Sequence, residues 1–277
     1  MTVSTSRGDD GVALLRAGRA IEAVDVLRQA VAAGEEGAED LLARAYLDSG
    51  SWHAAAEWLS RLVEAGRTEF ARRLGVALVG VGDTDTAEAA FRHAMATGDI
   101  AAANDLAILL RDRGRPAEAQ LVLEQAIAAD DPVAPANLVE LYLEAGDLRA
   151  AVDTAQRYVD EARPDTLVAL GDVRVAQDRG AEAERLYRQA AQLGAARAHT
   201  ACGAYLVSIG AIEAAEREFR AAVRAGEPRW ALTMGRFLLD TDRVEEAREY
   251  LQAGADSGDV EAAEILGELD GVDPTDD

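Results

Sequence analysis

Residues 195–226 read AARAHTACGAYLVSIGAIEAAEREFRAAVRAG, and they contain the unit from which the rest of the chain is built. The stretch is typical of two amphipathic helices, the first ending near Gly210 and the second near Gly226. Each glycine can adopt the left-handed conformation in which helices commonly end. The same pattern returns 32 residues earlier and 32 residues later. The chain is therefore predicted to be an array of helix pairs.

Small and large side chains recur in this array at fixed places. Alanine occupies eight positions spaced by 32 residues, namely Ala23, Ala55, Ala87, Ala119, Ala151, Ala183, Ala215 and Ala247. A second class is mostly small, namely Gly11, Ala43, Gly75, Ala107, Val139, Gly171, Gly203, Gly235 and Gly267. A third class is mostly large, namely Leu27, Leu59, Phe91, Leu123, Ala155, Tyr187, Phe219 and Leu251. Small residues let two helices approach closely, and large residues fill the space between pairs. The regular spacing predicts the same helix lengths and loops throughout.

Turn residues support the same helix boundaries. In the sixth unit Asp178 takes the place of the usual glycine and Gly180 follows, which predicts a slightly altered turn. Five prolines fall in predicted first turns of helices, where no intrahelical hydrogen bond is lost. They are Pro116, Pro132, Pro135, Pro164 and Pro228. Asp131 precedes one of them and is expected to cap its helix.

The order of these residues resembles the tetratricopeptide repeat. A small residue is followed by alanine, then by an aromatic residue or leucine, then by alanine, as in Gly203, Ala215, Phe219 and Ala222. The usual unit of that family has about 34 residues. The junctions over residues 190–203 and 254–267 look more like a sel-one-like repeat. The resemblance therefore implies a hybrid of the two repeat types.

The resemblance covers residues 9–269 and implies an all-α fold. The expected architecture is a right-handed α-solenoid of about eight helix-turn-helix repeats plus a C-terminal capping helix at residues 260–269. Residues 1–8 are expected to be disordered, and residues 270–277 are expected to form a mobile acidic tail.

The composition limits the classes of partner. The net charge is −23, from 28 basic and 51 acidic residues, and this argues against nucleic acid and anionic membranes as partners. Every basic residue is arginine, as in proteins from GC-rich bacterial genomes. The single cysteine, Cys202, fits a reducing cytoplasm, and no apolar run is long enough to span a membrane. A cytoplasmic protein is expected.

Candidates for catalysis are few. The sequence has three histidines and none of the common motifs for metal binding, phosphate binding or nucleophilic catalysis. His93 and His199 lie more than three repeats apart, so they cannot share a metal ion. Cys202 stands where the resembled family places a buried leucine, which indicates an inert thiol. We therefore expect no enzyme activity, no cofactor, no catalytic residue and no metal site.

In the families that this chain resembles, the first helix of each pair faces a concave groove. Matched position by position, the early groove residues are Asp40, Arg44, Arg72, Asn104, Ile108 and Arg111. The middle residues are Glu140, Glu144, Asp165 and Asp172, and the late ones are Arg197, Thr200, Arg229, Leu232, Arg236 and Leu239. The succession is basic, acidic and basic. Two interpretations stay open: the charges only keep this face soluble, or Arg44, Arg72 and Arg111 with Asn104 grip the carboxylates of an extended peptide.

The leading functional hypothesis is a protein-protein interaction scaffold or adaptor, a monomer or homodimer that binds a peptide or protein segment in the concave groove. An alternative is an RNA-binding helical repeat protein, which needs a basic inner face and is disfavoured by the acidic charge. A further alternative is a regulatory subunit of an enzyme complex that acts by self-association.

Overall fold

The computed structural model describes residues 6–271, and within them the secondary structure consists of seventeen α-helices and one short 3-10 helix, with no β-strand. The predicted all-α helical-repeat solenoid is therefore confirmed. The chain divides into two compact units, residues 6–102 with 256–259 and residues 103–255 with 260–271. None of the helices in the described part of the chain has the length and apolar run needed to cross a bilayer.

The first unit contains three helix pairs. They are α1 (Arg7–Arg16) with α2 (Ala20–Ala32), α3 (Ala38–Asp48) with α4 (Trp52–Glu64), and α5 (Ala71–Val81) with α6 (Thr84–Ala96), with the 3-10 turn η1 (Thr68–Phe70) before α5. Helix α1 begins at Arg7, two residues earlier than expected, because Ser6 and Asp9 cap each other's backbone N–H groups. The remainder of the segment expected to be disordered, residues 1–5, lies outside the described residues.

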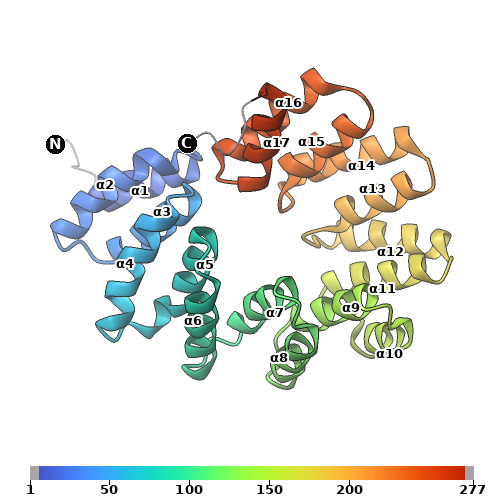
Figure 1. The fold of residues 1–277 in the computed structure, drawn as a ribbon, viewed down its shortest axis with the longest axis horizontal. Helices are drawn as coiled ribbons and strands as arrows, with labels where there is room; N and C mark the ends of the chain where they lie inside the picture. Colours follow the sequence, from blue (N-terminus) through green and yellow to red (C-terminus); the bar gives the residue numbers. More distant parts are fainter. Residues whose placement is uncertain (1–5, 272–277) are drawn as a thin grey trace. The chain divides into compact units, whose positions relative to one another are not determined.

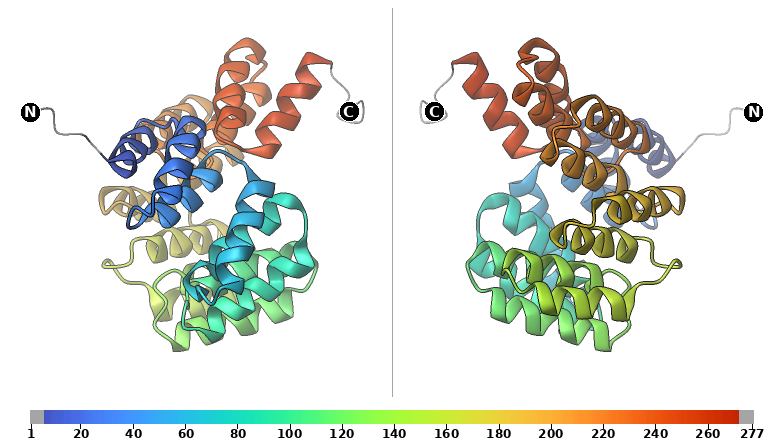
Figure 2. Two further views of the ribbon diagram at one scale, coloured as in Figure 1. Left: turned by 90° about the vertical axis from the view of Figure 1, so that its left-hand side faces the viewer. Right: turned by 90° about the vertical axis from the view of Figure 1, so that its right-hand side faces the viewer.

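The second unit is also built from helix pairs (Figure 1). Its pairs are α7 (Ala102–Asp112) with α8 (Pro116–Ala128), α9 (Ala134–Glu144) with α10 (Leu148–Tyr158), α11 (Asp165–Ala176) with α12 (Gly180–Gln192), α13 (Ala198–Ser208) with α14 (Ile212–Ala225), and α15 (Trp230–Asp240) with α16 (Val244–Asp256). The unpaired α17 (Val260–Asp270) follows, as expected for the capping helix. Figure 2 shows the pairs from α7 to α14 stacked one on the next. Residues 272–277 of the expected tail lie outside the described residues.

The recurring small residues of the first helices pack against the recurring large residues of the second helices within the same pair, a contact that the sequence analysis did not predict. A Cβ atom added to Gly203 would lie 2.6 Å from Cε1 of Phe219, and one added to Gly171 would lie 2.5 Å from Cε1 of Tyr187. The alanines of the first class are fully buried, including Ala119. The two helices of a pair therefore approach closely where these residues meet, and we call this contact the seam. A larger residue at a glycine position of the seam would push the two helices apart.

Acidic residues that follow the second helices hold the start of first helices. Glu227 accepts hydrogen bonds from the backbone N–H groups of His199 and Thr200, at 2.8 and 2.9 Å, and so caps α13 from the next loop. Asp131 accepts from the backbone N–H groups of Val133 and Ala134, at 2.9 and 2.8 Å, and so holds the start of α9, although the N-cap residue is Val133 and not Asp131 as predicted. These contacts fix where α9 and α13 begin.

The prediction of identical helices and turns fails in the fifth pair. Helix α10 has 11 residues, whereas the second helices α8 and α12 have 13. It ends at Tyr158, and an extended segment follows in which Asp160 pairs with Arg163. No glycine is available there, and Pro164 disfavours helical geometry at the residue before it.

The turn predicted to be altered in the sixth pair keeps the common form. Asp178 itself adopts the left-handed conformation, with φ of 59°, and Gly180 starts α12. Aspartate tolerates this conformation better than most residues, because its short side chain can bond locally. Among the prolines, Pro116 and Pro135 occupy first turns, whereas Pro132, Pro164 and Pro228 lie just before their helices.

Candidate functional site: the inner groove of the second unit

Three adjoining hollows run along the first helices of the second unit. The first is lined by α7 and α9, the second by α9 and α11, and the third by α11 and α13. Arg197 lines all three hollows, Glu140 lines the first two, and Asp172 lines the last two. The shared residues make the hollows one continuous inner groove. The first two hold about 160 and 140 Å³, less than the 300–1,000 Å³ of typical small-molecule sites, whereas the third holds about 410 Å³.

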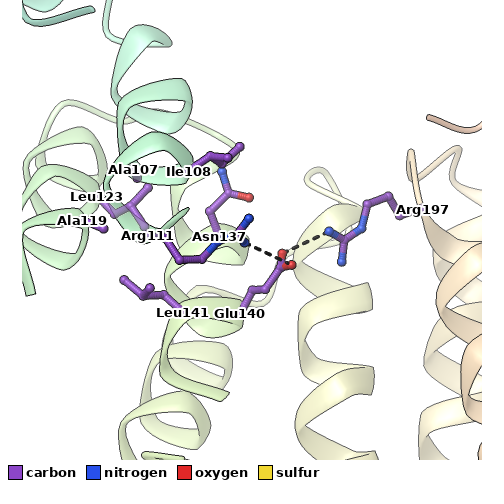
Figure 3. Close-up of a pocket in the computed structure, with 9 residues that line it drawn as sticks. All are labelled: Ala107, Ile108, Arg111, Ala119, Leu123, Asn137, Glu140, Leu141 and Arg197. Carbon is purple, nitrogen blue, oxygen red and sulfur yellow. Dashed lines mark hydrogen bonds and ion pairs between the residues drawn. The ribbon is translucent and has the colours of Figure 1, made fainter. Parts of the chain in front are cut away.

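An ionic chain joins three repeats across this groove (Figure 3). Nη1 of Arg197, which precedes α13, donates to Oε2 of Glu140 on α9 at 3.0 Å. The other oxygen of Glu140 lies 3.9 Å from Nη1 of Arg111 on α7. Arg111 also contacts Glu144 at 3.3 Å and Asp112 at 3.0 Å. One guanidinium group therefore faces three carboxylates at the α7 end of the groove.

Asp172 is the most perturbed carboxylate of the groove. Burial raises its pKa to about 6, while the hydrogen bond from Tyr187 and the charge of Arg197 act in the opposite direction. The Tyr187 hydroxyl donates to Oδ1 of Asp172 at 2.6 Å. Burial and the neighbouring Asp172 charge raise the pKa of Tyr187, so this phenol stays protonated. The pair connects the seam of α11 and α12 to the groove.

Asn104 belongs to a buried ladder of polar side chains. Its Nδ2 donates to Oδ1 of Asp131 at 3.0 Å, and its Oδ1 accepts from Nδ2 of Asn137 at 2.8 Å. Asn104 is 9% exposed and Asp131 is 7% exposed. The amide thus joins α7 to α9 and to the loop before it. We therefore assign Asn104 a structural part in the groove wall.

The other predicted groove residues lie in two further places. Arg229 and Arg236 both pair with Glu261, which brings the start and middle of α15 to the first turn of α17. Arg44 lies on α3, where its Nε contacts Asp48 at 3.1 Å, and Arg72 lies in the first turn of α5. Both belong to the first unit, and Asn104 and Arg111 belong to the second. The predicted residues that line the hollows are Ile108, Arg111, Glu140, Asp165, Asp172, Arg197 and Thr200.

Two residues of the groove network escaped the sequence analysis. Tyr187 was assigned only to the seam, but its hydroxyl reaches the groove. Asn137 lies 33 residues after Asn104, one more than the repeat length, so a search at a spacing of 32 does not pair them. A polar tip on a large seam residue is the signal that could have revealed Tyr187.

The groups considered for catalysis are held by local contacts. Burial raises the pKa of the Cys202 thiol to about 12, which keeps it in the unreactive protonated form. Nδ1 of His199 lies 2.8 Å from a carboxylate oxygen of Glu218. Within residues 6–271, no group of three histidine, cysteine or acidic side chains is placed to hold a metal ion.

The geometry defines a helical-repeat protein with a polar inner groove. Models of the tetratricopeptide repeat match residues 110–173, 164–189 and 203–260. The chain is thus a tetratricopeptide-like repeat protein, a family that serves in general as a protein-interaction scaffold. The comparison with curated proteins finds no match to the sequence.

Solved structures share the fold at low sequence identity. Yeast Tom70 has a TM-score of 0.60 at 11% identity over 91% of this chain and 59% of its own. A chain of the APC/C hetero-tetramer Cut9-Hcn1 has a TM-score of 0.52 at 14% identity over 94% of this chain and 54% of its own. The thermophilic TPR protein TTC0263 of Thermus thermophilus has a TM-score of 0.51 at 18% identity over 61% of this chain and 97% of its own. The chain thus spans just over half the length of the first two. These likenesses concern the fold.

Proposed function

We propose that this protein is an adaptor that holds an extended segment of a partner protein in the inner groove of the second unit. The residues assigned to the contact surface are Ile108, Arg111, Glu140, Asp172 and Arg197. The observation that supports this proposal is that Arg197 lines all three hollows along four consecutive first helices, with Glu140 in the first two and Asp172 in the last two. Arg44 and Arg72 of the first unit, and Arg229 and Arg236 near α17, remain predictions for additional contacts.

The chemistry of the groove favours recognition over catalysis. Its charged groups are already paired or hydrogen-bonded, and its hollows are open to solvent. A preformed groove lowers the ordering cost of binding, because the receptor side does not have to fold around the segment. The carboxylates of the groove also disfavour RNA as the ligand. The single buried cysteine supports a cytoplasmic location for the adaptor.

The direct test is to block the groove and compare the recovered proteins. Ala204 is exposed on α13 and lines the third hollow, so Ala204→Trp fills the groove. Ala181 is exposed on α12, so Ala181→Trp places the same side chain on a second helix as a matched control. Affinity purification followed by mass spectrometry is expected to recover a set of partners with the wild type and with Ala181→Trp. Ala204→Trp is expected to lose them.

The proposal fails if Ala204→Trp and the wild type recover the same partners in the same amounts. Circular dichroism and thermal unfolding of all three proteins control for folding. Size-exclusion chromatography with light scattering, on the same samples, distinguishes a monomer from a homodimer.

A further inference from the structure

The groove contains more carboxylates than guanidinium groups. The three hollows are lined by two arginines, Arg111 and Arg197, and by Glu140, Asp165 and Asp172. Arg111 is in addition surrounded by Asp112 and Glu144 at the rim. An acidic peptide would have to compete with these carboxylates for Arg111, whereas a basic peptide would add charge of the sign that the groove lacks.

Arg197 supplies a positive charge to the middle of the groove from a distant part of the chain. It lies 57 residues after Glu140, and its side chain is 48% exposed. The ion pair that it forms with Glu140 at 3.0 Å is therefore exposed to solvent. Surface ion pairs of this kind contribute little to stability. The guanidinium group can leave Glu140 at small cost.

The backbone that carries Arg197 is held independently of its side chain. The N–H of Ala196 donates to Oδ1 of Asp165 at 3.0 Å, and Ala195 is buried. On the other side, the N–H of His199 donates to Glu227 at 2.8 Å. Loss of the Arg197 side chain therefore leaves the loop and the start of α13 in place.

Asp172 provides a second carboxylate beside Arg197. It lines the two hollows that Arg197 also lines next to α11, and the Tyr187 hydroxyl fixes its Oδ1 at 2.6 Å. A carboxylate oriented in this way is ready to accept from an incoming donor, because little side-chain freedom is left to lose. Glu140 and Asp172 thus line the same hollow as Arg197, whose guanidinium group contacts Glu140 and whose charge also acts on Asp172.

We infer that the partner segment is basic, and that it brings an arginine which displaces Arg197 from Glu140 and binds between Glu140 and Asp172. This inference rests on the proposed function of the groove and names the chemistry of its ligand. The planar guanidinium group suits the role because it can donate to two carboxylates at once. The net charge of −23 also favours the approach of a basic partner. Arg197 then acts as an internal competitor that limits affinity until a suitable arginine arrives.

The test uses the full chain and three capped twelve-residue peptides as probes. The peptides share a serine-glycine background and carry three arginines, three lysines or three glutamates at the same positions. Isothermal titration calorimetry at 150 mM salt is expected to show the arginine peptide binding at least about tenfold more tightly than the glutamate peptide. The lysine peptide is expected to lie between them, because lysine lacks the planar fork.

Variants separate a specific contact from the general attraction of an acidic protein. The double variant Glu140→Gln with Asp172→Asn is expected to bind the arginine peptide with about tenfold lower affinity. Glu213→Gln with Glu249→Gln changes the net charge equally at exposed positions of α14 and α16, and is expected to change its affinity less than twofold. Arg197→Ala is expected to strengthen binding by about three- to tenfold, because it removes the competing cation.

The inference is overturned if the glutamate peptide binds best, if both double variants weaken binding equally, or if Arg197→Ala weakens the arginine peptide. It is overturned likewise if no peptide binds. If Ala204→Trp still loses the natural partners while any of these results holds, the proposed groove function stands and only the basic character of the ligand fails.

Discussion

The pairs α11–α12 and α13–α14 are built on the same seam but differ in how that seam meets the groove. In the first pair Gly171 packs against Tyr187, and in the second Gly203 packs against Phe219. The Tyr187 hydroxyl donates to Asp172 at 2.6 Å, whereas the residue that follows Gly203 is Ala204. A single oxygen atom thus couples the packing of one repeat to the groove. The comparison teaches that the scaffold positions of a repeat can also shape its binding surface.

The largest expected effect concerns what the two pairs share. Gly203→Ala and Gly171→Ala place a methyl group within 2.6 Å of a buried aromatic ring, and each is expected to lower the free energy of unfolding by about 2 to 3 kcal/mol. Ala204→Leu adds more atoms one residue further along but directs them into the open groove, so it should change stability by less than about 0.5 kcal/mol. Urea unfolding measures all three. A stabilised Gly203→Ala protein would contradict the close seam.

The second prediction removes what distinguishes the pairs. Tyr187→Phe makes the α11–α12 seam resemble its neighbour and leaves Asp172 without its donor, so the free energy of unfolding should fall by about 1 to 2 kcal/mol at pH 8. The same substitution in the Asp172→Asn background should cost less, since a hydrogen bond to a neutral amide is weaker. A double-mutant cycle from urea unfolding measures the difference. An equal loss in both backgrounds would show that the hydroxyl and the carboxylate are not coupled.

The third prediction uses the raised pKa of Asp172. Because burial raises it to about 6, the folded state holds this proton more tightly than the unfolded state. The resulting stabilisation is fully present below the unfolded pKa near 3.8 and is lost as pH rises through about 6. Between pH 5 and pH 8, Asp172→Asn should therefore gain about 1 kcal/mol relative to the wild type. Unfolding measured at both pH values checks this. If the free energy of unfolding of Asp172→Asn instead fell relative to the wild type between pH 5 and pH 8, the raised pKa of Asp172 would be refuted.

The smallest expected effect compares surface ion pairs on the two second helices. On α12 Glu184 lies 4.0 Å from Arg188, whereas on α14 Glu216 contacts both Arg220 at 2.7 Å and Arg243 at 2.5 Å. Glu184→Gln should cost no more than about 0.3 kcal/mol, and Glu216→Gln about 1 kcal/mol. Thermal unfolding at low and high salt measures both, and raising the salt should shrink the difference. Equal losses would remove the distinction between an isolated pair and a shared carboxylate.

The sequence predicts the scaffold well because the seam is local and repeated. Glycine and alanine at fixed spacing are typical of places where helices meet closely, so the repeat pattern by itself assigns Gly203 and Ala119 to the seam. The end of α10 at Tyr158 was missed, because no glycine or proline marks it in the sequence: Pro164 restricts only Arg163. Handedness and the sel-one-like character of the junctions remain predictions.

For the groove, the sequence predicted which residues face it but not which side chains contact one another. Seven of the residues predicted for the groove line adjoining hollows, but their hydrogen-bond and ion-pair partners could not be predicted from a repeat pattern. The contact of Arg197 with Glu140 skips a whole helix pair, and the ladder through Asn104 and Asn137 shifts by one residue. Such contacts depend on side-chain reach across curved neighbouring helices, which spacing does not encode.

The most direct test of the central claim is photo-crosslinking from inside and outside the groove. Ile108 is 45% exposed and lines the first hollow, whereas Leu121 on α8 is 58% exposed and lines none of the three. A benzophenone amino acid at each position is to be irradiated in the presence of the partner recovered by affinity purification. We predict a crosslink from position 108 to one segment of the partner and none from position 121. Crosslinks from position 121 with none from position 108 would contradict binding in the groove.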